Sequence, residues 1–426
     1  MRLGAMVLGL LVAACGSDDD GNGGPSETGG TPGSGATGGS GGGSGGTSGA
    51  SGSGGTNAGG SSAVGGSSGS GGSGATGGSS TGGGGASGGT GGTTSATCVA
   101  LAKGPFEGSD RAVPGQTDRA YDIHVPPGYD CTKPTPVVVV LHPGGHDKAD
   151  AAKLTCPSDT TEPTNPNAPG CLNAVADQKG FVLVYPNGTK NPLLPNQNVR
   201  TFNAGGGENG YTCVSLYACT QKVDELAYFN ALLDDVEKLV NVDPKRVFAT
   251  GFSNGGAMTH KLGCTLANRI AAIASVSGGN QYAANATCAP GRPVPVLHVH
   301  GDTDGCWPYL GGNAGCLATG KMVTIPAGPS PVVAPSTIGG WVQRNTCGAT
   351  PAGSDLPNPV GGDGKVHLDA YGGCAQGADV ELYTVQGGGH FWPGGYTYDA
   401  SLPGVKNKDV NTSELVLDFF SKHAMP

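Results

Sequence analysis

Residues 246–264, RVFATGFSNGGAMTHKLGC, combine three features in one short segment. A strand-like apolar run is followed by the pattern Gly-x-Ser-x-Gly and then by the start of a helix. A serine at a tight strand-to-helix turn has strained backbone, and side chains at its flanks would clash, so Gly251 and Gly255 are needed there. In a chain with 82 glycines the Gly-x-Ser-x-Gly pattern can arise by chance, so it indicates a nucleophile only when a strand precedes it and a helix follows it. The context is present, and we predict Ser253 as a nucleophile.

Apolar runs of the same kind recur along the chain. Residues 136–142, PVVVVLH, are continuously apolar and β-branched, which is typical of a strand buried on both faces of a parallel sheet. Residues 120–126 alternate like a half-exposed strand. The remaining predicted strands lie at 181–186, 246–250, 271–278, 294–301 and 380–385.

Two segments have helical periodicity. Within 225–240 the apolar residues form one stripe, and residues 411–423 form a last helix capped by Asn411, Thr412 or Ser413. The stripe consists of Leu226, Phe229, Leu233, Val236 and Val240. Strands that alternate with helices predict an α/β fold, with a mainly parallel sheet and helices on both faces.

A serine hydroxyl needs a base to take its proton and a carboxylate to orient that base. Such residues follow the carboxyl ends of parallel strands. Asp302 and Asp304 follow one predicted strand, and His390 lies in a glycine-rich loop after the last one. We therefore predict Ser253, Asp304 and His390 as the catalytic residues. Asp302 is the alternative acid, or a brace for the turn.

The oxyanion of an acyl-transfer reaction needs two N–H donors. One predicted donor is the amide of Asn254, and the other is that of Gly144 or Gly145 in the segment HPGGH. His298 and His300 alternate within a predicted strand, which favours packing or loop-anchoring roles. Other histidines outside the predicted catalytic set include His142, His146, His260, His367 and His423.

The N-terminus has the pattern of a bacterial export signal. Arg2 precedes an apolar run that is too short to span a bilayer and that ends in a lipobox-like Val-Ala-Ala-Cys. We interpret residues 1–15 as a lipoprotein-type signal with Cys15 as the lipidated residue. An ordinary secretory signal is the alternative. Both predict an extracellular or cell-envelope location.

Residues 16–97 hold 37 of the 82 glycines and consist otherwise mostly of Ser, Thr and Ala. Such a segment cannot bury enough surface to offset its ordering entropy, so we predict a disordered linker with a span on the order of 50 Å. Residues 98–426 remain as one catalytic domain. The net charge of −9 and the lack of basic clusters exclude nucleic acid as a partner, and the only expected membrane contact is the lipid.

Twelve of the 13 cysteines lie beyond Cys15. An even set in an exported protein predicts disulfides, up to six in number. A zinc site is the rival interpretation, but no Cys-x-x-Cys pair occurs and the histidines are scattered, so we predict no metal. Pairing is not deducible from sequence, and neighbouring pairs are offered as guesses: 213–219, 264–288, 306–316 and 347–374.

These features together resemble the secreted α/β-hydrolase esterases that include feruloyl esterases and polyhydroxybutyrate depolymerase-like proteins. The resemblance spans roughly residues 118–425 and implies the roles already given to Ser253, Asp304 and His390, with no cofactor. The family's oxyanion strand often ends in His-Gly, whereas here it ends in His142-Pro143. The matching pieces are YDIHVPPGY, VVVVLHPGG, VDPKRVFATGFSNGGAMTHKLGC, AAIASVSG, PVPVLHVHGDTDGCWPYLGG, WVQRNTC and GGGHFWPGG.

Aromatic residues lie close in sequence to the predicted acid and base. Trp307 and Trp392 are candidates for an aromatic wall that stacks on a phenolic acyl group, and the alternative is that these rings pack the loops. We expect a serine carboxylesterase acting on feruloyl or related esters of plant polysaccharide such as xylan. The alternatives are a polyester depolymerase, an inactive surface binding protein on the same fold, and a peptidase or acyltransferase.

Overall fold

The computed structural model describes residues 110–158, 161–195, 197–206, 213, 215–314, 323–325, 336–399 and 401–426. The predicted signal segment with Cys15 and the predicted linker lie outside these residues. Within them, no helix combines the length and the apolar character that crossing a membrane requires.

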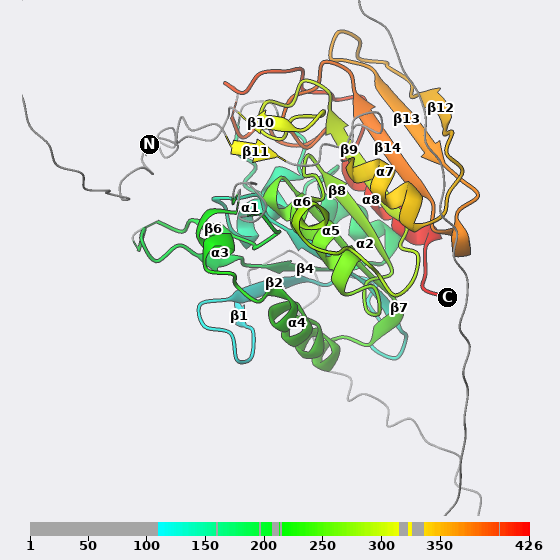
Figure 1. Cartoon of the computed structure of the whole chain (residues 1–426). Coiled ribbons are helices and arrows are strands. Elements are labelled where there is room, and N and C mark those ends of the chain that lie inside the picture. The colour runs from blue at the N-terminus through cyan, green and yellow to red at the C-terminus, as the bar shows by residue number, and fades with distance from the viewer. Residues whose placement is uncertain are drawn as a thin grey trace, which may run out of the picture. The chain divides into compact units, whose positions relative to one another are not determined.

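One sheet of ten strands forms the centre of the described structure, in the order β1-β2-β4-β3-β7-β8-β9-β14-β13-β12 (Figure 1). The six neighbours from β4 to β14 are parallel, and antiparallel strands flank them on both sides. The strands are β1 (Arg111–Ala112), β2 (Ala120–His124), β3 (Thr135–Leu141), β4 (Val182–Pro186), β7 (Val242–Phe252), β8 (Ala272–Val276), β9 (Val296–Gly301), β12 (Ala352–Asp355), β13 (Val366–Tyr371) and β14 (Val380–Val385).

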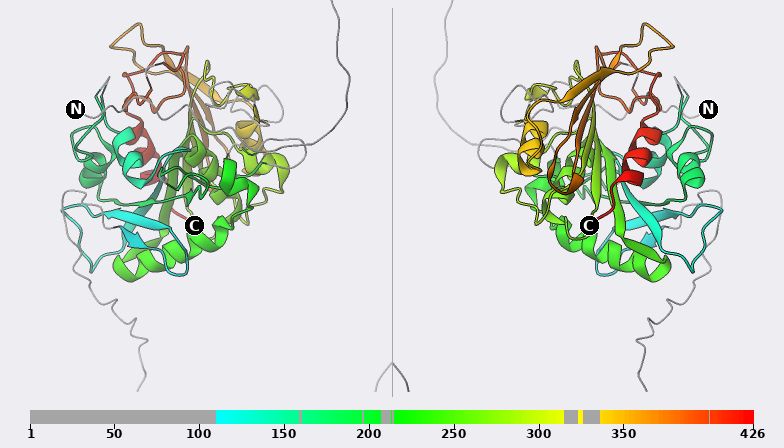
Figure 2. Two further views of the ribbon diagram at one scale, coloured as in Figure 1. Left: turned by 90° about the vertical axis from the view of Figure 1, so that its left-hand side faces the viewer. Right: turned by 90° about the vertical axis from the view of Figure 1, so that its right-hand side faces the viewer.

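Helices cover both faces of this sheet (Figure 2). The core on one face contains residues of α4 (Glu225–Leu239), α5 (Asn254–Thr265) and α7 (Thr337–Arg344). The core on the other face contains residues of α1 (Lys148–Leu154), α2 (Leu172–Lys179) and α8 (Thr412–Lys422). Both cores are needed because the parallel strands are apolar on both faces.

Short elements complete the described structure. They are the strand pairs β5 (Thr189–Lys190) with β6 (Arg200–Thr201) and β10 (Gly312–Ala314) with β11 (Val323–Ile325), the helices α3 (Leu216–Thr220) and α6 (Gln281–Asn285), and the 3-10 turn η1 (Ala375–Gly377).

The predicted α/β fold is confirmed, and each predicted strand and helix is present. Asn411 caps the last helix, since its side chain accepts a hydrogen bond from the Glu414 amide. The strands β12 and β13 were not predicted from the sequence. Both lie at the outer edge of the sheet, where β12 is exposed along its length and β13 is only partly buried, so neither has a strong apolar pattern.

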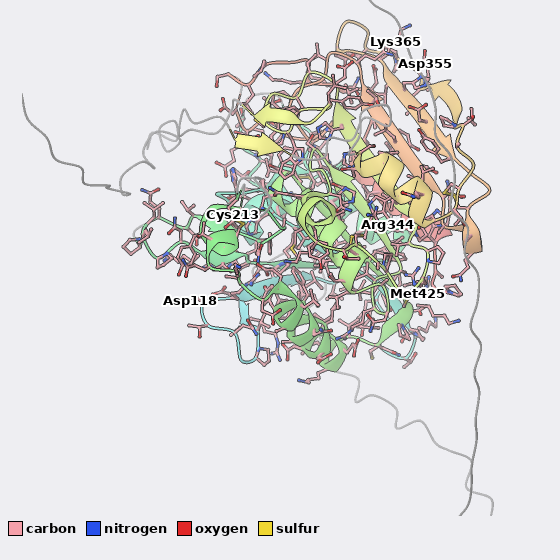
Figure 3. The ribbon with its side chains drawn as sticks, in the orientation of Figure 1. Asp118, Cys213, Arg344, Asp355, Lys365 and Met425 are labelled. Carbon is pink, nitrogen blue, oxygen red and sulfur yellow. A yellow bond between two sulfur atoms is a disulfide. The ribbon has the colours of Figure 1, made fainter. Side chains whose placement is uncertain are left out.

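Four disulfides lie among the described residues. Three are predicted pairs, Cys213–Cys219, Cys264–Cys288 and Cys347–Cys374, and the fourth joins Cys156 to Cys171 (Cys213 is labelled in Figure 3). The predicted pair 306–316 includes a residue outside the described part. Disulfides persist in oxidising compartments, so this set fits an extracytoplasmic location.

Candidate active site

The Ser253 turn joins strand β7 to helix α5, as the sequence predicts. Ser253 has φ 56° and ψ −117°, a conformation that costs of order 1–3 kcal/mol for a non-glycine residue. The surroundings hold it there, because its N–H donates to the Val276 carbonyl at 2.9 Å and its carbonyl accepts from the Ala257 N–H at 2.9 Å. The side chain is half-buried at the carboxyl edge of the sheet.

The flanking glycines are required by close backbone approach. A Cβ atom on Gly251 would lie 2.6 Å from the backbone of Gly255, and one on Gly255 would lie 2.3 Å from the Leu141 carbonyl oxygen. Both contacts are with backbone atoms, which side-chain rotation cannot relieve. The turn therefore packs directly against the end of β3, the strand that leads into the predicted oxyanion segment.

The predicted acid and base form a buried pair. The Nδ1–H of His390 donates to Asp304 Oδ2 at 2.7 Å, and the two residues are both 4% exposed. The other carboxylate oxygen, Oδ1, accepts from the N–H groups of Cys306 at 2.8 Å and Trp307 at 2.7 Å. This pairing fixes the tautomer of His390 that leaves Nε2 free to accept a proton.

The Asp304 carboxylate is charged in this environment. Burial alone would raise its pKa, but the charge of His390 and the hydrogen bonds from His300 and His390 outweigh burial and hold the pKa well below its usual value. The competing carboxylate, Asp302, is exposed and accepts a hydrogen bond from the Gly387 N–H at 2.6 Å. Asp302 thus braces the turn and does not contact His390.

Ser253 and His390 follow strands of the same parallel array and lie at the same edge of the sheet. The ring of Phe252, the neighbour of the serine, lies 4.9 Å from the imidazole of His390 between ring centroids. Neither Ser253 Oγ nor His390 Nε2 has a hydrogen-bond partner within the described ranges. Such contacts are often long in unliganded sites and tighten when substrate binds.

The three predicted oxyanion donors differ in availability. The Gly145 N–H is occupied, because it donates to the Arg200 carbonyl at 2.9 Å. The N–H groups of Gly144 and Asn254 have no partner in the part of the chain that the structure describes. A Cβ atom on Gly144 would lie 3.4 Å from Asn254 Cβ, so the two backbones adjoin. Of the two glycines, only Gly144 has a free donor.

Two buried side chains hold this pair of amides in place, and the sequence analysis gave neither this role. His142 donates from Nδ1 to the Pro143 carbonyl at 2.7 Å and accepts at Nε2 from the Gly188 N–H at 2.8 Å. Burial lowers the pKa of His142 to about 3, so it remains neutral. The Asn254 side chain makes two hydrogen bonds to the Phe202 backbone, at 2.8 and 3.0 Å.

The two tryptophans predicted to bind substrate are in the core. Trp307 is 2% exposed and Trp392 is 3% exposed, and each packs in one of the two core clusters. This burial favours the packing alternative. The half-buried ring of Tyr398 instead lies beside the site, 5.9 Å from the ring of Phe252 and 5.8 Å from that of His146. Tyr398 lies eight residues after His390, but no motif quoted from the sequence includes it.

Among the residues that the structure describes, one group of side chains has the spacing of metal ligands, namely Asp304, Cys306 and His390. The sulfur of Cys306 is in a disulfide, and the other two residues bond to each other. The donors are therefore already used, and this cluster does not fit a metal ion.

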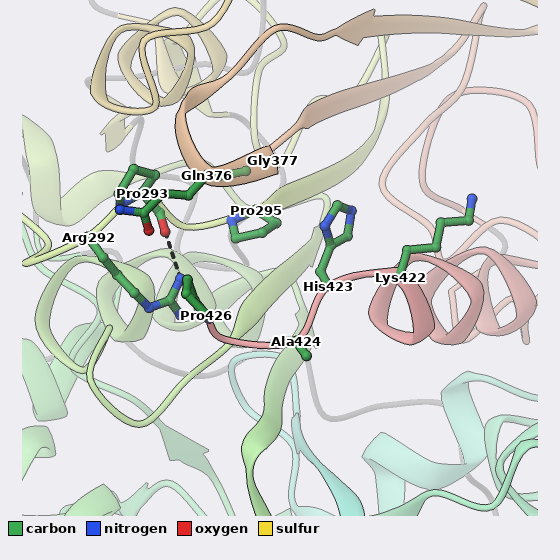
Figure 4. A pocket seen from close by; sticks show the side chains of 10 residues that line it. Arg292, Pro293, Pro295, Gln376, Gly377, Lys422, His423, Ala424 and Pro426 are labelled. Carbon is green, nitrogen blue, oxygen red and sulfur yellow. Dashed lines mark hydrogen bonds between the residues drawn. The ribbon is translucent and has the colours of Figure 1, made fainter.

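A separate pocket lies away from this edge, lined by Arg292, Pro293, Pro295 and the last residues of the chain (Figure 4). Pro295 and Ala378 precede strands β9 and β14, so this pocket is at the amino ends of the strands. The predicted catalytic residues are all at the carboxyl ends. The pocket is thus at the opposite edge of the sheet from the candidate active site.

Comparison with known proteins agrees with this architecture. The family described as Phospholipase/Carboxylesterase matches residues 219–315, the segment that contains the Ser253 turn and Asp304. The chain has the α/β-hydrolase fold. This hydrolase is 27% identical over 314 residues to a protein named as an esterase, NocK of Nocardia uniformis subsp. tsuyamanensis, covering 72% of the chain and 80% of the relative.

The hydrolase is also 26% identical over 270 residues to Feruloyl esterase B of Piromyces equi, covering 63% of this chain and 42% of that relative. It thus spans less than half of the length of that relative. Among solved structures, the acetyl xylan esterase from Aspergillus awamori aligns with a TM-score of 0.40 at 15% identity, over 65% of this chain and 90% of that one. The family match and the names of these relatives support the carboxylic ester hydrolase predicted from the sequence.

Proposed function

We propose that this hydrolase is an extracytoplasmic serine esterase that releases feruloyl or related phenolic acids from plant polysaccharide through an acyl-enzyme. The observation that carries the proposal is the buried Asp304–His390 pair, joined at 2.7 Å, at the sheet edge where Ser253 occupies its strained turn. An imidazole held in this tautomer is ready to accept a hydroxyl proton.

The proposed reaction begins when Ser253 Oγ attacks the ester carbonyl carbon and His390 Nε2 takes the hydroxyl proton. The carbonyl oxygen becomes an oxyanion that the N–H groups of Gly144 and Asn254 stabilise. The tetrahedral intermediate then breaks its bond to the alcohol oxygen, and His390 returns the proton to that alcohol. Water attacks the acyl-enzyme by the same route, and this releases the acid and restores Ser253.

Two observations support a phenolic acyl group. One relative of this chain is named a feruloyl esterase. The half-buried rings of His146 and Tyr398 lie 5.8 Å apart beside the site, with the Tyr398 ring against the buried Phe252 ring, and burial raises the pKa of Tyr398, which keeps its hydroxyl neutral. Aromatic rings of this kind pair with a planar acyl group by offset stacking or edge contact.

The enzymatic proposal is tested with the full chain on a short-chain nitrophenyl ester, with Ser253→Ala as the matched control. We expect release that depends on Ser253, and a wild type no faster than the control would overturn the proposal. The substrate proposal is tested by comparing methyl ferulate, acetylated xylan and short-chain polyhydroxybutyrate. Faster release from the polyester or the acetyl ester than from ferulate would reverse the ranking of substrates.

A lipid anchor at Cys15 is a second part of the proposal, and it rests on the lipobox-like sequence. Two lipid-bearing signals are usual for stable anchoring, so the number of acyl chains matters as well as their presence. Expression in a bacterial host with labelled fatty acid tests it. We expect label in the wild type and none in Cys15→Ser, and equal label in both would contradict the anchor.

A further inference from the structure

A buried row of aromatic side chains leads away from the candidate active site. His298 and His300 extend from strand β9 on one face of the sheet, His260 lies on α5, and Trp341 lies on α7. All four are 0% exposed. The imidazoles of His298 and His300 stack with an interplanar angle of 9°, and the rings of His260 and Trp341 continue the row.

One donor fixes the direction of every hydrogen bond in this row. The Trp341 indole can only donate, and it donates to His260 Nδ1 at 3.0 Å. His260 must therefore carry its proton on Nε2, which lies 3.2 Å from His298 Nδ1. By the same reasoning His298 is protonated on Nε2, which lies 3.0 Å from His300 Nδ1. Each imidazole thus has one tautomer, and each N–H points toward β9 and the acid loop.

The row ends at the acid of the candidate site. His300 Nε2 donates to the Trp307 carbonyl at 2.7 Å and lies 3.2 Å from Asp304 Oδ2. Trp307 in turn donates its N–H to Asp304 Oδ1. His300 therefore contacts the turn at two points, the Trp307 carbonyl and the Asp304 side chain. Its N–H group directs its positive end at the carboxylate.

His260 and His298 are neutral, so they give the row a direction without adding charge. Burial lowers the pKa of His260 to about 3 and that of His298 well below its usual value. The Arg344 guanidinium lies 5.6 Å from the Trp341 ring centroid at one end of the row, and the Asp304 carboxylate lies at the other end (Arg344 is labelled in Figure 3). The positive charge at one end and the carboxylate at the other both favour N–H groups that point from Trp341 toward Asp304.

We propose that His300, aligned by His298, His260 and Trp341, is a positioning residue that fixes the Asp304 carboxylate for its bond to His390. This inference rests on the proposed esterase function. It assigns a role to the second histidine before the acid loop, which the sequence analysis expected only to pack or to anchor a loop. A side chain that fixes the rotamer of a catalytic residue through hydrogen bonds maintains the geometry of the site without touching substrate.

The test uses the full chain and three variants, assayed on the nitrophenyl ester. His300→Leu removes the donor, His300→Gln keeps an N–H donor, and His367→Gln changes a half-exposed histidine on β13 as the control. We expect kcat to fall about 10-fold or more in His300→Leu with KM within about 3-fold, and to recover in His300→Gln. Equal kcat in the Leu, Gln and control variants would overturn the proposal.

A second measurement does not depend on the folding of any variant. Long-range nitrogen–proton NMR spectra of the wild type with labelled histidine report the tautomer of each imidazole. We expect His260, His298 and His300 to be protonated on Nε2 alone at pH 8, and His260 and His298 to stay so down to about pH 5. An Nδ1–H form of any of the three at pH 8, or a doubly protonated His260 or His298, would contradict the row. A wild type without esterase activity would instead defeat the proposed function, so the two failures are distinct.

Discussion

Replacement of Asp304 by Asn tests the buried pair with the smallest change in shape. The carboxylate accepts the N–H groups of Cys306 and Trp307 at one oxygen, and at the other it accepts His390 and lies near His300. An amide has one oxygen and one NH₂ group. Either the two backbone N–H groups or the side of the two histidines must therefore face the NH₂ group, which is itself a donor. If the oxygen stays with the backbone amides, the NH₂ group meets Nδ1 of His390 and forces the proton onto Nε2.

An imidazole protonated on Nε2 cannot accept the proton of Ser253. In a serine protease triad the equivalent change lowers kcat by about 10⁴. We expect a loss of about 10³ to 10⁴ here, which corresponds to about 4–5 kcal/mol of transition-state stabilisation. The assay is kcat on the nitrophenyl ester, with thermal unfolding to show that the variant is folded.

The matched control is Asp302→Asn. Asp302 accepts one backbone N–H from Gly387, and an amide oxygen can do the same, so kcat should stay within about 3-fold of the wild type. A folded Asp304→Asn variant that keeps more than about a tenth of wild-type kcat would refute the reasoning. An equal loss in Asp302→Asn would show that the acid was assigned to the wrong carboxylate.

Three further predictions concern stability. Burial lowers the pKa of His142 and His260 to about 3, so the unfolded chain binds protons below about pH 6.5 and the folded chain does not. The stability that these two neutral histidines contribute is complete above pH 6.5 and is lost as the pH falls. The unfolding free energy measured in urea titrations should therefore fall by about 4 kcal/mol when the pH is lowered from 7 to 5. A free energy that is level over this range would contradict their burial as neutral groups. Gly255→Ala places a methyl group 2.3 Å from a backbone oxygen of β3 and should cost about 3 kcal/mol or more, and a variant as stable as the wild type would disprove the close approach. Replacing Cys264 and Cys288 together by Ala opens a 24-residue separation and should lower stability by about 3 kcal/mol in chemical unfolding, whereas an unchanged midpoint would show that the bond contributes nothing.

The sequence was most informative where one segment sets its own conformation. The β-branched run of β3 and the glycines beside Ser253 are local requirements of burial and of a strained turn, so they could be predicted. The strands β12 and β13 were missed because β12 is exposed at the sheet edge and β13, next to it, is only partly buried. Their pairing is decided by the strand beside them, which leaves little apolar pattern to detect.

Contacts between distant segments could not be predicted in the same way. The choice between Gly144 and Gly145 depends on a carbonyl at Arg200, 55 positions beyond Gly145 in the numbering. The row that reaches Asp304 likewise depends on an indole from α7 that meets an imidazole from α5. The disulfide between Cys156 and Cys171 was not anticipated, because several pairings of nearby cysteines satisfy the sequence equally well.

The central claim is that Ser253 is the activated nucleophile of this hydrolase. The most direct measurement is covalent labelling of the full chain with a fluorophosphonate, followed by mass spectrometry of the labelled peptide. We predict one adduct, on Ser253, that disappears in Ser253→Ala and forms much more slowly in Asp304→Asn and in a His390→Ala variant. An adduct on another serine, or no adduct in an esterolytic preparation, would contradict the account.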